Sequence, residues 1–307
     1  MPDDTRETET AASSSTTANR VVFEIERQFA QPLAPGLYLV ATPIGHLADL
    51  SLRAIATLAR ADVVYCEDTR HSRTLLAHYA IRANLRPYHE HNAETERPRI
   101  MRELAAGRAV ALISDAGTPL ISDPGFKLVR DAAAEGYAVT AVPGPSATLA
   151  ALTVAGLPTD AFFFAGFLPP KEGARKARIG ELAAVPGTLV VFEAPTRAAA
   201  TLADLADRLG NREAVLAREL TKLHEEVRRG TLAELAEKAE SDPPKGEVVI
   251  VVGPPSDEEA SDATIAERLA PALETLSLRD ATKMVADTLK VPKARVYDIA
   301  LDLKRRQ

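Results

Sequence analysis

Short apolar runs of strand length alternate with amphipathic stretches along most of this chain, and this alternation constrains the fold more than any other feature. The first set of runs consists of LYLVAT (37–42), DVVYC (62–66), AVALIS (109–114) and YAVTAV (137–142). Between these runs, apolar residues recur at helical spacing. Strands that alternate with helices imply right-handed βαβ crossovers, so the pattern predicts an α/β fold with a mainly parallel sheet.

A second set of apolar runs begins after GLPTD (156–160). Its members are AFFFAGF (161–167), TLVVFEA (188–194), AVLAREL (214–220) and EVVIVVG (247–253). Because the rhythm of strands and helices pauses at GLPTD, we expect two α/β domains, over residues 35–157 and 158–254.

The two ends of the chain differ from this body. Residues 1–34 are rich in Ser, Thr, Ala and acidic residues, so we expect a disordered tail there. The stretch PPSDEEASD (254–262) has the composition of a linker. Short helical patterns follow it, and they predict a small helical module over 262–307.

Charge, cysteine content and apolar length exclude several classes of protein. The 307 residues carry 37 Lys and Arg against 43 Asp and Glu, a net charge of −6, which argues against a protein that coats nucleic acid through bulk charge. The single cysteine, Cys66, excludes an intramolecular disulfide. No apolar stretch reaches the roughly 18 residues that span a bilayer. The start is acidic, unlike a signal peptide, so we expect a cytoplasmic protein.

Three loops rich in glycine and proline follow strands of the first set: ATPIGH (41–46), SDAGTPLISDPG (114–125) and PGPSA (143–147). Ligands of α/β sheets bind at the carboxyl ends of the strands, where such loops let a ligand approach the backbone closely. One such loop alone is more often a simple turn, but three at one sheet edge favour a site for a polar small molecule. Neither GxGxxG nor GxxxxGK[ST] occurs, so the loops do not indicate NAD or a nucleoside triphosphate. The six histidines form no HExxH motif, and we expect no metal.

The chain contains, in this order, VATPIG (40–45), YCEDTRHSRTLL (65–76), HEHN (89–92), SDAGTPLISDPG (114–125), PGPSA (143–147), FFFAGFLP (162–169) and ARELTKLHEE (217–226). In order and spacing these motifs resemble the ribosomal RNA small subunit methyltransferase I family, which belongs to the tetrapyrrole methylase superfamily. The terminal helices resemble the helix-turn-helix module that some members carry. One departure is His46, because the family pattern usually has Asn after PIG.

The resemblance implies an enzyme that transfers the methyl group of S-adenosyl-L-methionine to the 2′-hydroxyl of a decoding-site cytidine in 16S rRNA. It further implies that the protein is a homodimer and that its substrate is 16S rRNA or the small ribosomal subunit. The cofactor would lie in a cleft between the two α/β domains. Asp115 would lie near the cationic end of the cofactor. Carried over to this sequence, the cofactor-binding residues are Pro43, Gly45, Asp115, Ala116, Gly117, Thr118, Pro145, Ser146 and Ala147.

A ribose hydroxyl is a poor nucleophile, so methyl transfer to it needs a positioned base. The polar residues in the remaining motifs supply the candidates, which are Glu67, Asp68, His89, His91, Glu219, Lys222 and Glu225. Each has a structural alternative: Glu67, Asp68 and Arg70 can cap the helix that begins near Thr69, and the residues of 217–226 can form helical ion pairs. Motif membership favours Glu67, Arg70 and Lys222 as the catalytic residues near the acceptor.

RNA binding by an acidic protein needs local basic patches. One candidate patch follows Pro169-Pro170 and contains Lys171, Arg175, Lys176 and Arg178. The other is the stretch 278–307, which has eight Lys or Arg against four Asp. Either patch can also be an ordinary solvated helical face.

Two other functions stay open from the residues. A tetrapyrrole C-methyltransferase would share the fold and the cofactor cleft, although the ATPIG loop replaces the GxGxG loop that would favour it. A ligand-sensing, DNA-binding regulator would use the helices of 263–305 to read a groove. Against that regulator, the module is small and the distinctive residues gather in the α/β loops.

Overall fold

The computed structural model describes residues 5–255, 262–289 and 291–306. The chain divides into two compact units, Met1–Pro254 and Pro255–Gln307. The linker expected at 254–262 lies mostly outside the described residues, which omit 256–261. None of the described helices has both the length and the apolar character that a membrane span requires.

The first sheet of the larger unit is parallel throughout, as the sequence predicts. Its strand order is β3-β2-β4-β1-β5, so β4, β1 and β5 are neighbours. The three-residue strand β3 is too short to show a pattern in the sequence. The five strands are β1 (Gly36–Val40), β2 (Val63–Cys66), β3 (Leu85–Pro87), β4 (Ala109–Ile113) and β5 (Val139–Val142).

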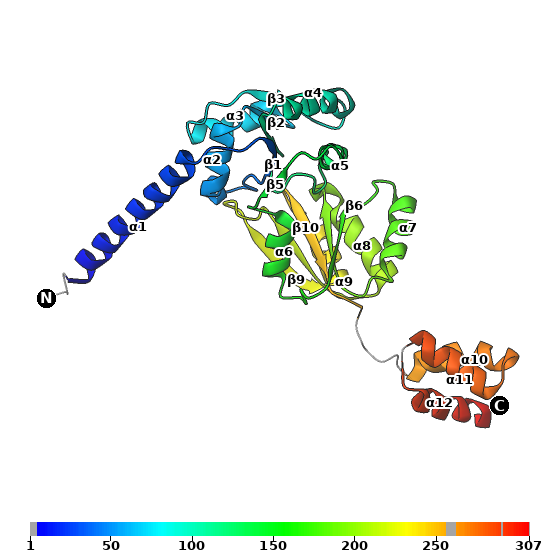
Figure 1. Ribbon diagram of the computed structural model, residues 1–307. Helices are drawn as coiled ribbons and strands as arrows, with labels where there is room; N and C mark the ends of the chain where they lie inside the picture. The colour runs from blue at the N-terminus through cyan, green and yellow to red at the C-terminus, as the bar shows by residue number, and fades with distance from the viewer. Residues whose placement is uncertain (1–4, 256–261, 290, 307) are drawn as a thin grey trace. The chain divides into compact units, whose positions relative to one another are not determined.

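Helices cover both faces of this sheet (Figure 1). On one face Leu58 and Leu75 pack against Val64 of β2, and on the other Ile100 packs against its neighbour Tyr65. Because both faces are buried, the strands are almost wholly apolar and do not alternate with polar residues. The helices are α2 (Leu52–Arg60), α3 (Thr69–His78), α4 (Ala93–Ala105) and α5 (Phe126–Ala134), with the short 3₁₀ helix η1 (Leu47–Asp49) before α2.

The second sheet has the order β6-β7-β10-β8-β9. Only β6 and β7 pair in parallel, while β7–β10, β10–β8 and β8–β9 are antiparallel. The expectation of mainly parallel pairing therefore does not hold for this sheet, because a hairpin and not a crossover helix joins β8 to β9. The strands are β6 (Phe162–Phe167), β7 (Thr188–Glu193), β8 (Glu213–Arg218), β9 (Glu226–Thr231) and β10 (Val248–Val252).

One face of the second sheet is covered by the helices that follow its strands, and their core includes Ile179, Leu202 and Leu235. The opposite face is covered in part by α6 (Ala147–Ala155), whose Leu152 packs against Val190 and Val251 (Figure 1). By its packing, α6 belongs with the second sheet, although it precedes the boundary expected after residue 157. The helices of the first face are α7 (Glu172–Leu182), α8 (Ala198–Leu209) and α9 (Leu232–Ser241), with the 3₁₀ helix η2 (Pro195–Arg197) before α8.

The N-terminal segment forms helix α1 (Thr5–Ala30) where we expect a disordered tail. The ion pair between Glu24 and Arg27, at 2.7 Å, supports the helix at the spacing of i and i+3. Its last turn is also held from α2, because Arg60 donates a hydrogen bond to the Gln28 carbonyl. Residues 1–4 of the expected tail lie outside the described residues.

The smaller unit consists of the three helices that the sequence predicts after the linker. They are α10 (Asp262–Thr275), α11 (Leu278–Leu289) and α12 (Lys293–Arg306). Ile265, Leu269, Val285, Val296 and Ala300 form its core. This unit therefore has an apolar core of its own.

Candidate active site

The three loops rich in glycine and proline meet at the carboxyl edge of the first sheet. Thr42 and Gly117 exchange backbone hydrogen bonds of 2.9 and 3.0 Å, which join the loops after β1 and β4. The Thr118 hydroxyl donates to the Pro145 carbonyl at 3.1 Å, which adds the loop after β5. Because β4, β1 and β5 are neighbours in the sheet, the loops that follow them form one continuous surface.

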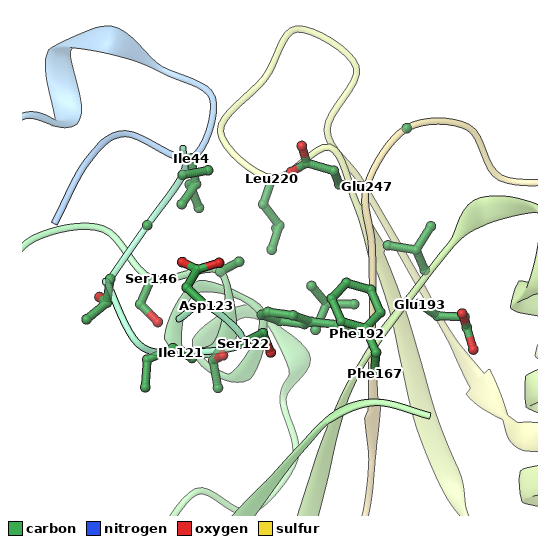
Figure 2. A pocket seen from close by; sticks show the side chains of 18 of the residues that line it. Ile44, Ile121, Ser122, Asp123, Ser146, Phe167, Phe192, Glu193, Leu220 and Glu247 are labelled. Atoms are coloured by element: carbon green, nitrogen blue, oxygen red, sulfur yellow. The ribbon is translucent and has the colours of Figure 1, made fainter. Parts of the chain in front are cut away.

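A pocket of about 380 Å³ opens between this surface and the second sheet. Figure 2 shows Ile44 and Ser146 on the side of the loops and the rings of Phe167 and Phe192 on the side of the sheet. The size is that of a typical small-molecule site. The pocket is lined by Ile44, Ala116, Gly117, Thr118, Ile121, Ser122, Asp123, Ser146, Ala147, Thr148, Phe167, Phe192, Glu193, Ala194, Pro195, Leu220, Gly246, Glu247, Val248 and Val249.

The walls suit a ligand with an apolar ring and polar ends. Phe192 and Val249 offer an apolar surface for a flat ring. At the start of α6, Ser146 caps the helix by accepting from the Leu149 amide, and the remaining amides of the first turn point out of the helix. The buried Thr148 hydroxyl has no hydrogen-bond partner among the described residues. These groups fit a nucleoside with a charged tail.

Three carboxylates lie near one another where the main pocket meets a small side pocket: Asp123 lines both pockets, Glu67 lines the side pocket, and Asp115 acts on both residues. Asp115 Oδ1 accepts a hydrogen bond of 3.1 Å from the Asp68 amide. Burial, with Asp115 next in effect, raises the pKa of Glu67. Burial and the neighbouring Glu67 raise the pKa of Asp123 to about 6. The negative charge of these groups therefore favours a cationic part of a ligand at this end of the pocket. Among the described residues, no group of three His, Cys, Asp or Glu side chains is placed to hold a metal ion.

The loop between β8 and β9 closes the top of the pocket and contacts the β1 loop. A Cβ atom on Gly45 would overlap the Lys222 side chain and lie 2.8 Å from Thr221 Oγ1, so only glycine fits there. Lys222 Nζ forms ion pairs with Glu219 at 3.0 Å and Glu247 at 3.2 Å. Glu219 and Thr221 have φ angles of 51° and 64°, which are uncommon for residues with side chains. We call this contact between residues 219–225, Gly45 and Glu247 the clasp.

The predicted cofactor residues divide into two groups. Ala116, Gly117, Thr118, Ser146 and Ala147 line the pocket. Three of the remaining four support the lining: Asp115 holds the start of α3, Gly45 meets the clasp, and the Pro145 carbonyl accepts a hydrogen bond from Thr118. Pro43 lies in the β1 loop between Thr42 and Ile44.

The candidate catalytic residues lie at different depths. Glu67 lines a small side pocket together with Tyr88 and Asp123. Asp68 caps α3 by accepting from the Arg70 amide at 2.7 Å, as the structural alternative predicts, and the Arg70 side chain is 88% exposed. Lys222 belongs to the clasp, in a loop and not in the helix that the alternative requires.

The other candidates for the base have structural partners. Glu219 accepts from the Glu247 amide and Glu225 from the Thr221 amide, so both hold the clasp. The rings of His89 and His91 lie 6.0 Å apart. His89 Nδ1 is buried without a hydrogen-bond partner among the described residues.

The basic patch after Pro170 needs one correction. Arg175 is only 6% exposed, and its guanidinium bonds Asp204 at 2.6 Å, so it cannot contact RNA. Lys176 and Arg178 lie closer to the surface but form ion pairs with Glu172 and Glu181. Lys171 is exposed at the start of α7.

Sequence reasoning missed several residues that form the pocket. Asp123 lies inside the motif 114–125, so its membership of that loop was an available signal. Leu220 likewise lies inside the motif 217–226. Phe192 and Val249 are typical only of buried strands, because the sequence does not show which face of the second sheet is turned to the loops. Nothing in the sequence predicts that Glu247 lines the pocket, because its position depends on its ion pair with Lys222 in the clasp.

Two family models match the chain. Residues 36–236 match the Tetrapyrrole (Corrin/Porphyrin) Methylases, and residues 259–304 match the RsmI C-terminal HTH domain. Among solved structures, uroporphyrin-III C-methyltransferase from Thermus thermophilus complexed with S-adenosyl homocysteine is 25% identical, with a TM-score of 0.50, over 71% of this chain and 97% of that chain. A cobalt precorrin-4 methyltransferase has a TM-score of 0.54 at 18% identity, over 71% of this chain and 94% of that chain, and shows the same fold.

Several more similar relatives carry the name ribosomal RNA small subunit methyltransferase I. That of Mesorhizobium japonicum is 51% identical over 90% of this chain and 94% of its own length. That of Pseudomonas aeruginosa is 46% identical, and the match covers 86% of this chain and 96% of the relative. That of Halalkalibacterium halodurans is 43% identical over 86% of this chain and 93% of the relative. With both family models matched in order, the chain is a methyltransferase that belongs to the ribosomal RNA small subunit methyltransferase I family.

Proposed function

We propose that this protein transfers a methyl group to the 2′-hydroxyl of a decoding-site cytidine in 16S rRNA. One observation carries the proposal: the loops 41–46, 114–125 and 143–147 together line one side of the same pocket in a chain that is 40–51% identical to relatives named for small-subunit rRNA methylation. The fold alone would fit many methyl acceptors. The choice of acceptor therefore depends on the relatives and on the C-terminal unit.

The methyl donor is S-adenosyl-L-methionine. When bound, it supplies an electrophilic methyl group on a cationic sulfur. Phe192 and Val249 would bind its adenine ring, and the start of α6 would bind its polar groups. The carboxylates of Glu67, Asp115 and Asp123 would favour the positive charge at their end of the pocket.

The acceptor must be held beside the carboxylate end of the pocket and must lose its hydroxyl proton. We propose that Glu67 contributes to this step through its charge, from the side pocket that it shares with Asp123. Arg70, which is exposed at the start of α3, would bind an RNA phosphate. Lys222 would act through the clasp, by holding Glu219 and Glu247 in place.

RNA binding is assigned to exposed basic residues of both units. In the larger unit, Lys171 is the exposed residue of the first patch that is best placed to contact an RNA phosphate. Lys176 and Arg178 would contact phosphates only after their ion pairs with Glu172 and Glu181 break. In the smaller unit, Arg279, Lys283, Lys293 and Arg305 are exposed. The match of residues 259–304 to a helix-turn-helix family supports a nucleic-acid role for this unit.

We also propose that the protein works as a cytoplasmic homodimer, as the resemblance implies. The edge strand β6 exposes Phe162 and Phe163 by 45% and 39%, and exposed aromatic residues on an edge strand support an interface with a second copy. Light scattering of the purified protein at micromolar concentration tests the dimer. A monomer at that concentration would contradict it.

The test of the function is transfer of labelled methyl from S-adenosyl-L-methionine to small ribosomal subunits that lack the modification, followed by nuclease mapping. Label on a decoding-site cytidine, in a linkage resistant to alkaline cleavage, is the expected result, because a 2′-O-methyl group blocks attack by that oxygen. Naked 16S rRNA is assayed in parallel to identify the form of the substrate. Cofactor binding without label on either RNA would contradict the proposal and favour the tetrapyrrole C-methyltransferase.

A further inference from the structure

Asp123 occupies a distinctive position, because it lies on the wall of the main pocket and also on that of the side pocket that contains Glu67. Figure 2 shows its carboxylate directed into the main pocket, toward the space that Ile44, Leu220 and the two phenylalanine rings enclose. None of the motif-based candidates for the base is among the residues that line this pocket. Two other acidic residues line the main pocket, but Glu193 is bonded to Thr201 and Arg197 and Glu247 is paired with Lys222. Asp123 has no such cationic partner among the described residues and is therefore the acidic side chain best placed to meet a group bound there.

The backbone around Asp123 is held in an uncommon conformation. Leu120 and Ser122 have φ angles of 73° and 68°, although neither is glycine. Leu120 packs under the turn, and a Cβ atom on Gly125 would lie 3.1 Å from it. Residues with side chains adopt such angles where the surrounding structure requires a particular placement, and these positions cluster at functional sites. Here both residues precede Asp123 in the same loop, which supports a required placement of Asp123.

The charged groups that act on Asp123 within the described chain are the carboxylates of Glu67 and Asp115. The hydroxyl of Ser114 partly offsets their effect by lowering the pKa of Asp123, and Tyr88 lines the side pocket next to it. Like charges and burial both disfavour the ionised form. As a result, the pKa of Asp123 is raised to about 6, where a carboxylate becomes a useful proton acceptor near neutral pH.

We propose that Asp123 is the general base of the reaction and accepts the proton of the acceptor ribose hydroxyl. This inference rests on the proposed function and names the residue that removes the proton. The hydroxyl O–H bond breaks, its proton passes to a carboxylate oxygen of Asp123, and the oxygen uses an electron pair to form the bond to the methyl carbon. The methyl–sulfur bond breaks with its electron pair left on sulfur, and Asp123 afterwards releases its proton to water.

The other candidates are engaged elsewhere. Asp115 accepts from the Asp68 amide and so holds the start of α3. Lys222 forms two ion pairs in the clasp, outside the lining of the main pocket. Glu67 lines only the side pocket, where its charge acts on Asp123. Glu67 is thus a positioning residue that sets how readily Asp123 takes a proton.

The first experiment compares Asp123→Asn with the unsubstituted protein in single-turnover methyl transfer to small subunits. Asparagine keeps the shape but cannot accept the proton, so the rate is expected to fall by about 10²- to 10⁴-fold. The dissociation constant of S-adenosylhomocysteine, measured by calorimetry, is expected to change by less than about threefold, since the two side chains are isosteric and the sulfur of this ligand carries no positive charge for the carboxylate to favour. Asp207→Asn, the same change on an exposed residue of α8, is the matched control and is expected to retain both values.

The second experiment uses pH and does not depend on that variant. In the unsubstituted protein the transfer rate is expected to rise with pH through about 6 and then to level off, because only the ionised Asp123 accepts a proton. Glu67→Gln removes a neighbouring negative charge, so the rising part of the profile is expected to move to lower pH. Carbon-13 NMR of protein labelled at aspartate, without cofactor, is expected to show a carboxyl that titrates near pH 6 and disappears in Asp123→Asn.

Several results would overturn the proposal. A normal transfer rate in Asp123→Asn would exclude proton transfer to this residue, and so would a pH profile that Glu67→Gln leaves unmoved. Loss of S-adenosylhomocysteine binding in a folded Asp123→Asn protein would assign the residue to cofactor binding instead. Failure of the proposed function looks different: the unsubstituted protein would then bind cofactor but methylate neither subunits nor naked 16S rRNA.

Discussion

The raised pKa of Asp123 predicts a cost in stability as well as a catalytic use. The pKa of this carboxyl is near 3.8 in the unfolded chain and about 6 in the folded protein. As pH rises from about 4 through 6, the unfolded chain ionises first, so the folded protein loses stability over this range. Asp123→Asn removes this cost, so the free energy of unfolding at pH 8 is expected to rise by about 1–3 kcal/mol. Urea denaturation at pH 4 and pH 8 tests this, and an equal effect at both values would contradict it.

Arg175 and Lys171 lie four residues apart and are expected to behave in opposite ways. Arg175→Met leaves Asp204 buried without its strongest partner, so unfolding should become easier by about 3 kcal/mol, moderated by Lys176 at 3.5 Å. Lys171→Ala changes an exposed side chain and should alter stability by less than about 0.5 kcal/mol. Chemical denaturation and subunit binding distinguish them: only Lys171→Ala is expected to weaken binding while stability is unchanged. Weakened binding in a folded, equally stable Arg175→Met protein would contradict this assignment.

At the scale of elements, the close approach of the β1 loop to the clasp predicts a large effect from one methyl group. Gly45→Ala places its Cβ against Lys222 and Thr221, so the free energy of unfolding should fall by about 1–3 kcal/mol, and S-adenosylhomocysteine should bind at least about tenfold more weakly. Gly180→Ala is the matched control, because nothing lies within 4 Å of its added Cβ in α7. It should raise stability by about 0.5–1 kcal/mol. Calorimetry and denaturation of both variants test the pair, and equal behaviour would contradict the clasp.

At the scale of the whole molecule, the two units are expected to divide the work of cofactor binding and RNA docking. Replacing the exposed Arg279, Lys283 and Lys293 by Ala in the full chain should leave S-adenosylhomocysteine affinity unchanged and weaken subunit binding. The salt dependence of that binding should also fall, by about 0.7–0.9 in the slope of log K against log salt for each lost phosphate contact. Lys238→Ala on α9, on the face of the second sheet opposite the pocket, is the control. An unchanged slope in the triple variant would show that the smaller unit does not contact phosphates.

Much of the fold could be predicted because the central, buried strands of both sheets are recognisable from contiguous residues. Strands such as VVYC (63–66) are buried on both faces and are therefore apolar throughout, and Ser146 marks the start of α6 as an N-cap. The charged strand β9 left no such record, because it lies at an edge and is only partly buried. Helix α1 also escaped prediction, since its first half is rich in Ser and Thr, which favour a helix weakly.

By itself, the sequence determined the alternation of strands and helices, the three loops that carry the pocket, and the family resemblance, because each is written in contiguous residues. Only the tertiary structure decided which loops meet, since that depends on the strand order β4-β1-β5. It also showed that Arg175 is buried against Asp204 and that Asp123 lies among other carboxylates and faces the pocket. A side chain's burial and its neighbours' charges come from residues distant in the chain, and these set its pKa and its use.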